Sequence, residues 1–562
     1  MSRTLFFALV VLVSRPVLVC AATPPIRMVA HGDVPPAALQ RLETEARAAC
    51  ERAADWLGVE LAPAPVVCHI YPTLEAKGLD TGYTLPAHSL PADGVVYAVA
   101  ESGFEGELAR EVASVVLWRA LGVARLDVLT EGMATACAQS WYGRGAEYWA
   151  ARLAAFDDAG ELGWMFSNRD FHAESPLVRR ALAGAFVSFL VEERGARGVL
   201  AMWSAGAPSA DERARLESRW RTHLAALRRA HPAGRNRRSL TGFQRGFCFA
   251  HEGYRIRDGY LSAEADGALA RLRDMGVNSV SLTPFSFLRS PGRPAPLPFS
   301  SGPGAENDES IVHAAACARR LGMTVVLKPH IWVRGGWPGE IAMAGEAEWT
   351  AFFASYTTWM RHYALLAEMH GMDVLCVGVE MSKATVGHER EWVRMVAQLR
   401  TVYSGAVTYA ANWWEEYEEV SFWKDFDYVG IDCYYPLASD TSVTDARLAA
   451  AAGDVLDRIE ALAARYGRQV LITEVGFASR RASWMAPHDE GNGRDDVDVR
   501  AQARCYDAFL GAVSGRTRIQ GVYFWKWPSF LADGGPHHDG FTPNGKPAEA
   551  VVKRWFLGPL SR

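Results

Sequence analysis

Two glutamates occupy equivalent places in the C-terminal half of the chain and could act together on one substrate. Glu380 closes the apolar segment DVLCVGVE, and Glu474 lies within QVLITEVGF. They are 94 positions apart (474 − 380), which equals three repeats of about 31 residues. Hydrolysis of a glycosidic bond needs a protonated carboxyl group for the leaving oxygen and an ionised carboxylate for the anomeric carbon. A separation of about 5.5 Å between the two gives retention of configuration.

A single carboxylate at such a position could merely neutralise a nearby lysine or arginine. This pair, however, is accompanied by Asn412, Tyr434 and Trp525, which stand near the ends of neighbouring apolar segments. Amide and phenol groups hydrogen-bond to hydroxyl groups, and indole rings pack against flat apolar faces such as the C–H faces of sugars. The combination favours a hydrolytic site over an isolated structural ion pair.

The segments that carry these residues repeat regularly after Gly242. Eight apolar segments alternate with amphipathic helical ones such as AEADGALARLRDMG. The strand candidates are GFCFAHE, VNSVSLTPF, TVVLKPHIWV, DVLCVGVEM, AVTYAANWW, FDYVGIDCYYP, QVLITEVGF and IQGVYFWKW. Strands this apolar are typical of a parallel sheet covered by helices. We predict an α/β fold, a (β/α)₈ TIM barrel over residues 242–562, whose functional side chains gather at the C-terminal strand ends. An open, doubly wound sheet is the alternative, and the absence of a glycine-rich phosphate turn disfavours it.

At these strand ends the chain resembles glycoside hydrolase family 113. The phrases LKPHIW, VGVEM, TYAANWW, DYVGIDCYYPL, ITEVGF and GVYFWKW occur in this order, and the resemblance covers about residues 242–557. It implies a retaining, double-displacement glycosidase that needs no cofactor, with Glu380 as the acid/base and Glu474 as the nucleophile. Activities in the family are chiefly endo-β-1,4-mannanases, so β-mannan is the first expectation for the substrate. The alternatives are another β-glycan (glucan, xylan or an oligosaccharide) and a non-catalytic carbohydrate-binding barrel.

The resemblance also implies substrate-binding residues. Tyr434 matches a tyrosine that donates a hydrogen bond to the nucleophile, and Trp525 matches a sugar-stacking floor. The polar residues expected to contact sugar hydroxyls are Asn412, His330 and Lys328. Lys328 could instead be a counter-ion for a nearby carboxylate. The wider clan has asparagine immediately before the acid/base, where this chain has Val379, so Asn412 is expected to hold the 2-hydroxyl in its place.

Four further residues are candidates for substrate contact. Trp413 and Trp414 follow one another on a predicted strand, and side chains alternate in direction along a strand. At most one of them, Trp413 in our prediction, should therefore face the site. His251 and Glu252 end the first strand of the barrel and are the other two candidates.

The mixed pattern of helical and strand-like segments in residues 24–227 predicts a smaller α+β domain. PAALQRLETEARAACERAADWLG has helical periodicity, and APVVCHIYP and GVVYAVA are short strand candidates. ELAREVASVVLWRALG followed by DVLTEGMATACA resembles the helix pair of gluzincin-type metallopeptidases, in which HExxH and a downstream glutamate bind zinc. The matching positions are Arg110, Glu111, Ser114 and Glu131. Both histidines are missing and an arginine would repel a dication, so we expect a degenerate zincin-like domain without metal. An unrelated α+β domain is the alternative.

The two ends of this domain have their own signatures. Residues 1–22 place one arginine before a short apolar run that ends in two alanines, which is typical of a secretory signal peptide and of export to the periplasm or the cell exterior. Arg15 and Pro16 make the run too short to span a membrane. Cys20 would suit a lipoprotein, but Val19 stands where a small residue is needed. Residues 228–241 contain RRAHPAGRNRR, which predicts a basic linker.

The bulk composition agrees with this division. A chain of 562 residues is long enough for two or three domains. Its net charge of −5 gives no reason to expect a nucleic-acid partner, whereas 19 tryptophans suit a carbohydrate groove or a large core. The nine cysteines lack the spacing of a metal site, although Cys50 and Cys68 could meet if their helix and strand pack together. The oligomeric state is left open.

Overall fold

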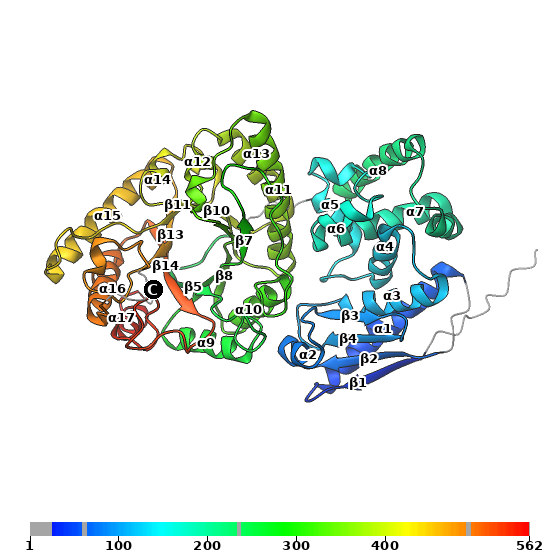
Figure 1. The fold of residues 1–562 in the computed structure, drawn as a ribbon, viewed down its shortest axis with the longest axis horizontal. Helices are drawn as coiled ribbons and strands as arrows, with labels where there is room; N and C mark the ends of the chain where they lie inside the picture. Colours follow the sequence, from blue (N-terminus) through cyan, green and yellow to red (C-terminus); the bar gives the residue numbers. More distant parts are fainter. Residues whose placement is uncertain (1–24, 59–63, 233–237, 491–495, 561–562) are drawn as a thin grey trace, which may run out of the picture.

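The computed structural model of the protein describes residues 25–58, 64–232, 238–490 and 496–560. An N-terminal domain and a C-terminal ring of strands and helices lie side by side along the longest axis (Figure 1). The predicted signal peptide at 1–22 and the middle of the predicted linker fall outside the described residues. Within the described ranges, no helix is long and apolar enough to cross a membrane.

A four-stranded sheet forms the base of the N-terminal domain, in the order β1-β2-β4-β3. Its strands are β1 (Ile26–Ala30), β2 (Val66–Tyr71), β3 (Ala87–Leu90) and β4 (Val95–Val99). The first, second and fourth are parallel, and the edge strand β3 runs antiparallel to β4. The prediction of a smaller α+β domain is thereby confirmed.

Helices cover this sheet and extend beyond it. They are α1 (Pro36–Leu57), α2 (Leu74–Thr81), α3 (Glu107–Leu121), α4 (Asp127–Ala138), α5 (Ala146–Leu153), α6 (Asn168–Ala173), α7 (Pro176–Ala205) and α8 (Ala210–Ala230), with the 3-10 turn η1 (Asp157–Gly160). The predicted amphipathic helix is α1, which ends at Gly58 with a φ of 60°, a conformation that glycine adopts without strain. Because α8 continues to Ala230, the first residues of the predicted linker are helical.

The C-terminal half is a closed barrel of eight strands, as predicted. The strands are β5 (Gln244–Ala250), β6 (Ser279–Leu282), β8 (Thr324–Leu327), β10 (Val374–Val379), β11 (Ala406–Asn412), β12 (Tyr428–Asp432), β13 (Gln469–Val475) and β14 (Ile519–Pro528). Every neighbouring pair is parallel, and β14 closes the ring on β5. Helices cover the outside of the ring (Figure 1). All six residues of β10 are buried, as expected of a strand enclosed on both faces.

The helices of the barrel alternate with its strands. They are α9 (Ala263–Asp274), α10 (Asp308–Arg320), α11 (Glu346–Met369), α12 (Ser382–Thr385), α13 (Glu389–Val402), α14 (Glu416–Glu419), α15 (Asp445–Arg465), α16 (Val499–Val513) and α17 (Pro547–Phe556). Three 3-10 turns are η2 (Pro338–Glu340), η3 (Trp423–Asp425) and η4 (Ser483–Met485). The buried side chains of α15 recur every three or four residues, which turns one face of this helix to the barrel.

One expected strand, TVVLKPHIWV, divides into two. The barrel strand β8 ends at Leu327, and β9 (His330–Val333) begins after Pro329. Proline has no amide hydrogen for a sheet ladder, which explains an interruption at this point. Beyond it, β9 pairs in parallel with β7 (Phe285–Leu288), so a small two-stranded sheet follows two barrel strands at their C-terminal ends.

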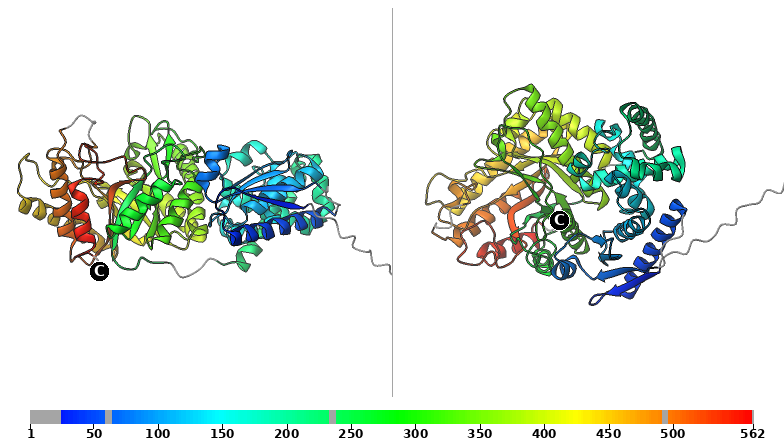
Figure 2. Two further views of the ribbon diagram at one scale, coloured as in Figure 1. Left: turned by 90° about the horizontal axis from the view of Figure 1, so that it is seen from below. Right: turned by 45° about the vertical axis from the view of Figure 1, so that its right-hand side comes forward.

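Buried ion pairs join the two domains along the outer barrel helices. Arg361 of α11 donates to Asp158 at 2.6 Å and to Glu174 at 2.8 Å, and its side chain is 1% exposed. His313 of α10 contacts Glu101 of the N-terminal domain and also lies 3.1 Å from Asp266 of α9. The left view of Figure 2 shows the N-terminal domain at one side of the barrel, where these ion pairs attach it to the outer helices.

The cysteines of the described residues are all free and buried. They include Cys50 and Cys68, so the disulfide that these two could have formed is absent from the structure. Burial raises the pKa of both thiols to about 12, which makes them unreactive core side chains.

Candidate functional site

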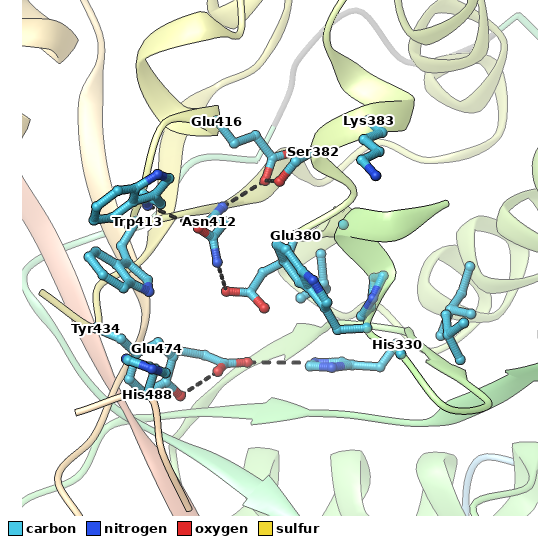
Figure 3. Close-up of a pocket in the computed structure, with 18 of the residues that line it drawn as sticks. His330, Glu380, Ser382, Lys383, Asn412, Trp413, Glu416, Tyr434, Glu474 and His488 are labelled. Carbon is cyan, nitrogen blue, oxygen red and sulfur yellow. Dashed lines mark hydrogen bonds and ion pairs between the residues drawn. The ribbon is translucent and has the colours of Figure 1, made fainter. Parts of the chain in front are cut away.

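A cavity of about 1160 Å³ opens at the C-terminal ends of the barrel strands. Both predicted catalytic residues line it, Glu380 directly after β10 and Glu474 within β13. Figure 3 shows the two side chains on opposite sides of the cavity, with their carboxyl groups turned toward the same space. This is the arrangement that the spacing of strands four and seven predicts.

Glu380 is held by the strand that follows it in the barrel. Its backbone N–H donates to the carbonyl oxygen of Ala410 at 2.8 Å, and its own φ is +49°, in the left-handed region that non-glycine residues rarely adopt. Asn412 Nδ2 donates to Glu380 Oε1 at 2.8 Å. Burial, and then the negative charges of Asp432 and Glu474, raise the pKa of Glu380 well above 4.5. A carboxyl group with these surroundings retains its proton at a pH where ordinary glutamates are ionised.

A buried glutamate braces the backbone around Glu380. Glu416 accepts hydrogen bonds from the backbone N–H of Asn412 at 2.8 Å and from the hydroxyl of Tyr409. The same Tyr409 hydroxyl lies 2.7 Å from the backbone N–H of Met381 and accepts from it. Glu416 therefore fixes both the residue after Glu380 and the asparagine that contacts its carboxyl group.

Glu474, in contrast to Glu380, is surrounded by hydrogen-bond donors and a cation. Tyr434 Oη donates to Glu474 Oε2 at 2.6 Å, as the resemblance implied, and Lys328 Nζ donates to Oε1 at 2.6 Å. His330 Nε2 lies 3.8 Å from the same Oε1. Charge-assisted hydrogen bonds of this kind are short and fix the orientation of a carboxyl group. One carboxyl group of the pair is thus arranged to keep its proton, and the other is held by a lysine and a tyrosine.

A second buried acid shares the cation. Lys328 Nζ also donates to Asp432 Oδ1 at 3.2 Å, and Thr473 Oγ1 donates to that oxygen at 2.8 Å. Burial and the charge of Glu474 raise the pKa of Asp432 to about 7, against the opposing effect of Lys328. Burial would lower the pKa of Lys328, but Asp432 and Glu474 outweigh it and raise that pKa, so the lysine stays charged.

Of the predicted substrate-binding residues, five line the cavity: Tyr434, Asn412, His330, Trp525 and Trp413. The rings of His330 and Trp525 lie 5.8 Å apart and form one side of the cavity. Burial and the charge of Lys328 lower the pKa of His330 well below 6.5, so its imidazole is neutral. A neutral imidazole can both donate to and accept from sugar hydroxyls.

Three predicted contacts lie elsewhere. Lys328 is fully buried beneath Glu474, so it is the counter-ion of two carboxylates and does not line the cavity. His251 is buried against Tyr260, and Glu252 pairs with Lys526, next to Trp525. Neither His251 nor Glu252 is part of the cavity lining.

The expectation that only one of two adjacent tryptophans faces the site is wrong. Both Trp413 and Trp414 line the cavity. The strand β11 ends at Asn412 and the chain turns there, so the alternation of a strand no longer applies to the next two residues. Their rings meet edge to face at 5.3 Å.

Sequence reasoning missed several members of the site. Asp432 and Glu416 are two buried acids that were not predicted. For Asp432 a signal was present, because DCYYP places an acid at the end of a strand. Lys383, Trp332 and Trp337 line the cavity from segments that follow the strands. Two tryptophans in HIWVRGGW, at the end of the third apolar segment and just after it, were the available signal in the sequence.

In the N-terminal domain, the four positions compared with a zinc site lie on or near two packed helices. The guanidinium of Arg110 on α3 contacts Glu107 at 3.2 Å, Glu131 of α4 at 3.7 Å, and Glu111. Burial would lower the pKa of Arg110, but these carboxylates raise it, so the arginine stays charged. Among the described residues, no three or more His, Cys, Asp or Glu side chains are grouped so as to hold a metal ion.

The comparisons with known proteins agree with the barrel and its site. The model of Glycoside Hydrolase Family 113 matches residues 247–546. The chain is similar to the solved GH113 beta-mannanase of Alicyclobacillus acidocaldarius in complex with ManMIm, with 31% identity and a TM-score of 0.50, over 56% of this chain and 98% of that one. A solved GH113 beta-1,4-mannanase is 25% identical, with a TM-score of 0.50, over 57% of this chain and all (100%) of that one.

No curated protein matches the chain. The family match nevertheless covers more than half of the 562 residues and includes both glutamates of the cavity. The chain therefore belongs to glycoside hydrolase family 113 and is a glycoside hydrolase.

Proposed function

We propose that the barrel hydrolyses internal bonds of β-1,4-linked mannan, with retention of configuration. The observation that carries this proposal is the contrast between the two carboxyl groups in one cavity. Burial, and then the negative charges of nearby acids, raise the pKa of Glu380. Glu474 accepts hydrogen bonds from Tyr434 and Lys328. Double displacement requires one carboxyl group that keeps its proton and a second one that is held in place to attack.

In the first step, Glu474 attacks the anomeric carbon while Glu380 gives its proton to the leaving oxygen. The glycosidic bond breaks as the ester bond to Glu474 forms, and the leaving sugar departs as an alcohol. Tyr434 and Lys328 hold and orient the attacking carboxylate through their hydrogen bonds. Asn412 holds the carboxyl group of Glu380 and lies where it can also reach a sugar hydroxyl.

In the second step, Glu380 acts as a base. Formation of the ester removes the negative charge of Glu474, so one of the three nearby charges that raise the pKa of Glu380 disappears. Glu380, now ionised, takes a proton from water as the water oxygen attacks the anomeric carbon, and the ester breaks to regenerate Glu474. Two inversions give net retention.

The choice of mannan rests on the relatives and on the shape of the site. The two solved relatives described above are β-mannanases. Four tryptophans of two segments line the cavity, Trp332 and Trp337 after β8, and Trp413 and Trp414 after β11. A cavity with this many aromatic rings suits several sugar units of a polymer, which supports internal cleavage.

Two experiments test this proposal. The purified protein is offered mannan, glucan and xylan, and we expect the largest kcat/KM for mannan, with β-configured oligosaccharides released first. Larger turnover of glucan or xylan would keep the mechanism and reject the substrate. Absence of hydrolysis on every glycan, by a folded protein, would leave a carbohydrate-binding barrel.

Azide separates the roles of the two glutamates. With Glu474→Ala, azide should attack the anomeric carbon directly and give a glycosyl azide of inverted configuration. With Glu380→Ala and a substrate that has a good leaving group, azide should replace water and give retained configuration. Reversed stereochemistry in the two variants would reverse the assignment.

For the N-terminal domain we propose a zincin-like fold that has lost its metal and serves for packing or binding. Its support is the position of Arg110, whose guanidinium lies among Glu107, Glu111 and Glu131 on the helix pair that resembles a metallopeptidase. The guanidinium supplies the positive charge that these carboxylates need, at a place where a zinc ion would otherwise meet them.

A further inference from the structure

The two-stranded sheet β7/β9 carries a pair of aromatic rings outside the catalytic centre. Phe287 and Trp332 are directly opposite in its parallel register. Their rings are stacked, with centroids 5.1 Å apart and planes 20° from parallel. Phe287 is 39% exposed and Trp332 is 53% exposed. Large aromatic side chains left this open to water mark a binding surface more often than an unused one.

The two rings have different relations to the cavity. Trp332 lines it, whereas Phe287 does not. Because the rings are stacked, the phenyl group covers one face of the indole and restricts its orientation. The indole still lines the cavity and is 53% exposed, so a ligand that enters the cavity can reach it.

A third aromatic ring comes from the segment that follows β9. Trp337 also lines the cavity, just before η2, and is 39% exposed. Its indole lies over Gly339, where an added Cβ would come within 2.2 Å of the ring. Glycine at this position therefore lets the indole lie flat against the backbone, so Trp337 is also held in place by its surroundings.

The platform of Trp332 lies beyond the sugar that is cleaved. His330, at the start of β9, has its Nε2 3.8 Å from Glu474. Trp332 is two residues further along the strand, which is about 7 Å at roughly 3.3 Å per residue. This displacement is on the order of one pyranose ring. A sugar stacked on Trp332 is thus a neighbour of the sugar bound at Glu474 and cannot itself be the reacting one.

We propose that Trp332, backed by Phe287 and accompanied by Trp337, binds a pyranose ring of the polymer at least one unit away from the scissile bond. The inference rests on the proposed function, because it assigns the ligand as the continuation of the substrate chain. A pyranose ring offers a flat C–H face of the size of an indole, and its hydroxyls remain in water at the rim. The platform favours long glycans over short ones and sets the chain-length preference of the enzyme.

The test compares a long and a short substrate in the same variants. The substrates are mannohexaose and an aryl β-mannoside, and the measured quantity is the ratio of their kcat/KM values. Loss of one aromatic stacking contact weakens binding by about 1.4 kcal/mol, which corresponds to about tenfold. We therefore expect Trp332→Ala to lower the ratio about tenfold, Trp332→Phe to restore most of it, and Phe287→Ala to lower it by a smaller factor. Trp118→Ala is the matched control, because Trp118 is a 37% exposed tryptophan on the N-terminal domain, and its ratio should equal that of the wild type.

An unchanged ratio in Trp332→Ala, or an equal loss on both substrates, would overturn the platform. Calorimetric binding to Glu474→Ala separates this claim from the proposed function. If the wild type hydrolyses neither substrate, the proposed function fails. The platform is then tested by binding alone, in Glu474→Ala with and without Trp332→Ala. Adding Trp332→Ala should weaken the binding of mannohexaose about tenfold more than that of mannobiose. Equal weakening of the two ligands would reject it.

Discussion

Replacement of Lys328 by methionine tests whether a buried cation keeps Glu474 ionised. Lys328 Nζ lies 2.6 Å from Glu474 Oε1 and 3.2 Å from Asp432 Oδ1, and its side chain is 1% exposed. Methionine fills similar volume without charge, so two buried carboxyl groups would share one region with no cation. Removal of one partner from a buried ion pair costs about 3–5 kcal/mol.

This cost predicts the loss of activity. One of the two carboxyl groups must take up a proton, and a protonated Glu474 cannot attack. If the whole cost appears in the barrier, kcat/KM on an aryl β-mannoside falls by roughly 100- to 5000-fold. Thermal unfolding of the same variant, followed by circular dichroism, shows how much of the cost appears in stability instead.

A second substitution makes the test specific. In Lys328→Met/Asp432→Asn, Glu474 is the one carboxyl group left of this pair, and Tyr434 still donates to it. We expect the double variant to recover at least about tenfold of the lost kcat/KM, because a lone hydrogen-bonded carboxyl group ionises more easily than one beside another acid. A folded Lys328→Met variant that loses less than about tenfold, or a double variant no better than the single one, would refute the reasoning.

Three further predictions follow from the titrating groups and from the N-terminal domain. Folding raises the pKa of Glu380 above 4.5, so the folded protein loses stability as the pH rises above 4.5 and this group is forced to ionise. Glu380→Gln should therefore raise Tm at pH 8 and have little effect at pH 4. An unchanged Tm at pH 8 would contradict the buried charge. Burial opposes the charged form of His313, but Asp266 and Glu101 raise its pKa from 6.5 to about 9, so its contribution is fully present below pH 6.5 and is lost as the pH rises through 9. Urea unfolding should show up to about 3 kcal/mol of this loss, and His313→Gln should abolish it; an identical pH dependence in the variant would exclude His313 as the cause. Elemental analysis of the purified protein should find no zinc bound through the N-terminal domain, because Arg110 occupies the centre of its carboxylates; one zinc per chain that is lost in Glu131→Ala would reject the metal-free domain.

The barrel and its pair of acids were predictable from local signals. Eight apolar segments alternating with amphipathic helices define a closed parallel sheet, and the strand-end position of Glu380 and Glu474 brings them to one rim. Tyr434 donates to Glu474 as the family pattern implied. These features depend on the order of elements along the chain, which periodicity reports directly.

The rest depends on tertiary contacts that periodicity does not report. Lys328 was expected either to contact sugar or to be the counter-ion of a nearby carboxylate, and only the packing inside the barrel shows that it lies beneath Glu474 in the second role. The turn after Asn412 brings Trp413 and Trp414 to the same cavity. Phe287 gains its place beside Trp332 from the pairing of β7 with β9, two short strands that Pro284 and Pro329 separate from the barrel.

The central claim is that Glu474 forms a covalent bond with the sugar. A 2-deoxy-2-fluoro mannosyl fluoride supplies a good leaving group and slows both steps, so the ester should accumulate when it is incubated with the protein. Mass spectrometry of the intact chain and of its peptides then locates the added sugar. We predict one fluorosugar per chain, on the peptide that contains Glu474, and release of the sugar when an acceptor glycan is added. A label on another residue, or turnover without any label and with inverted product, would contradict the account.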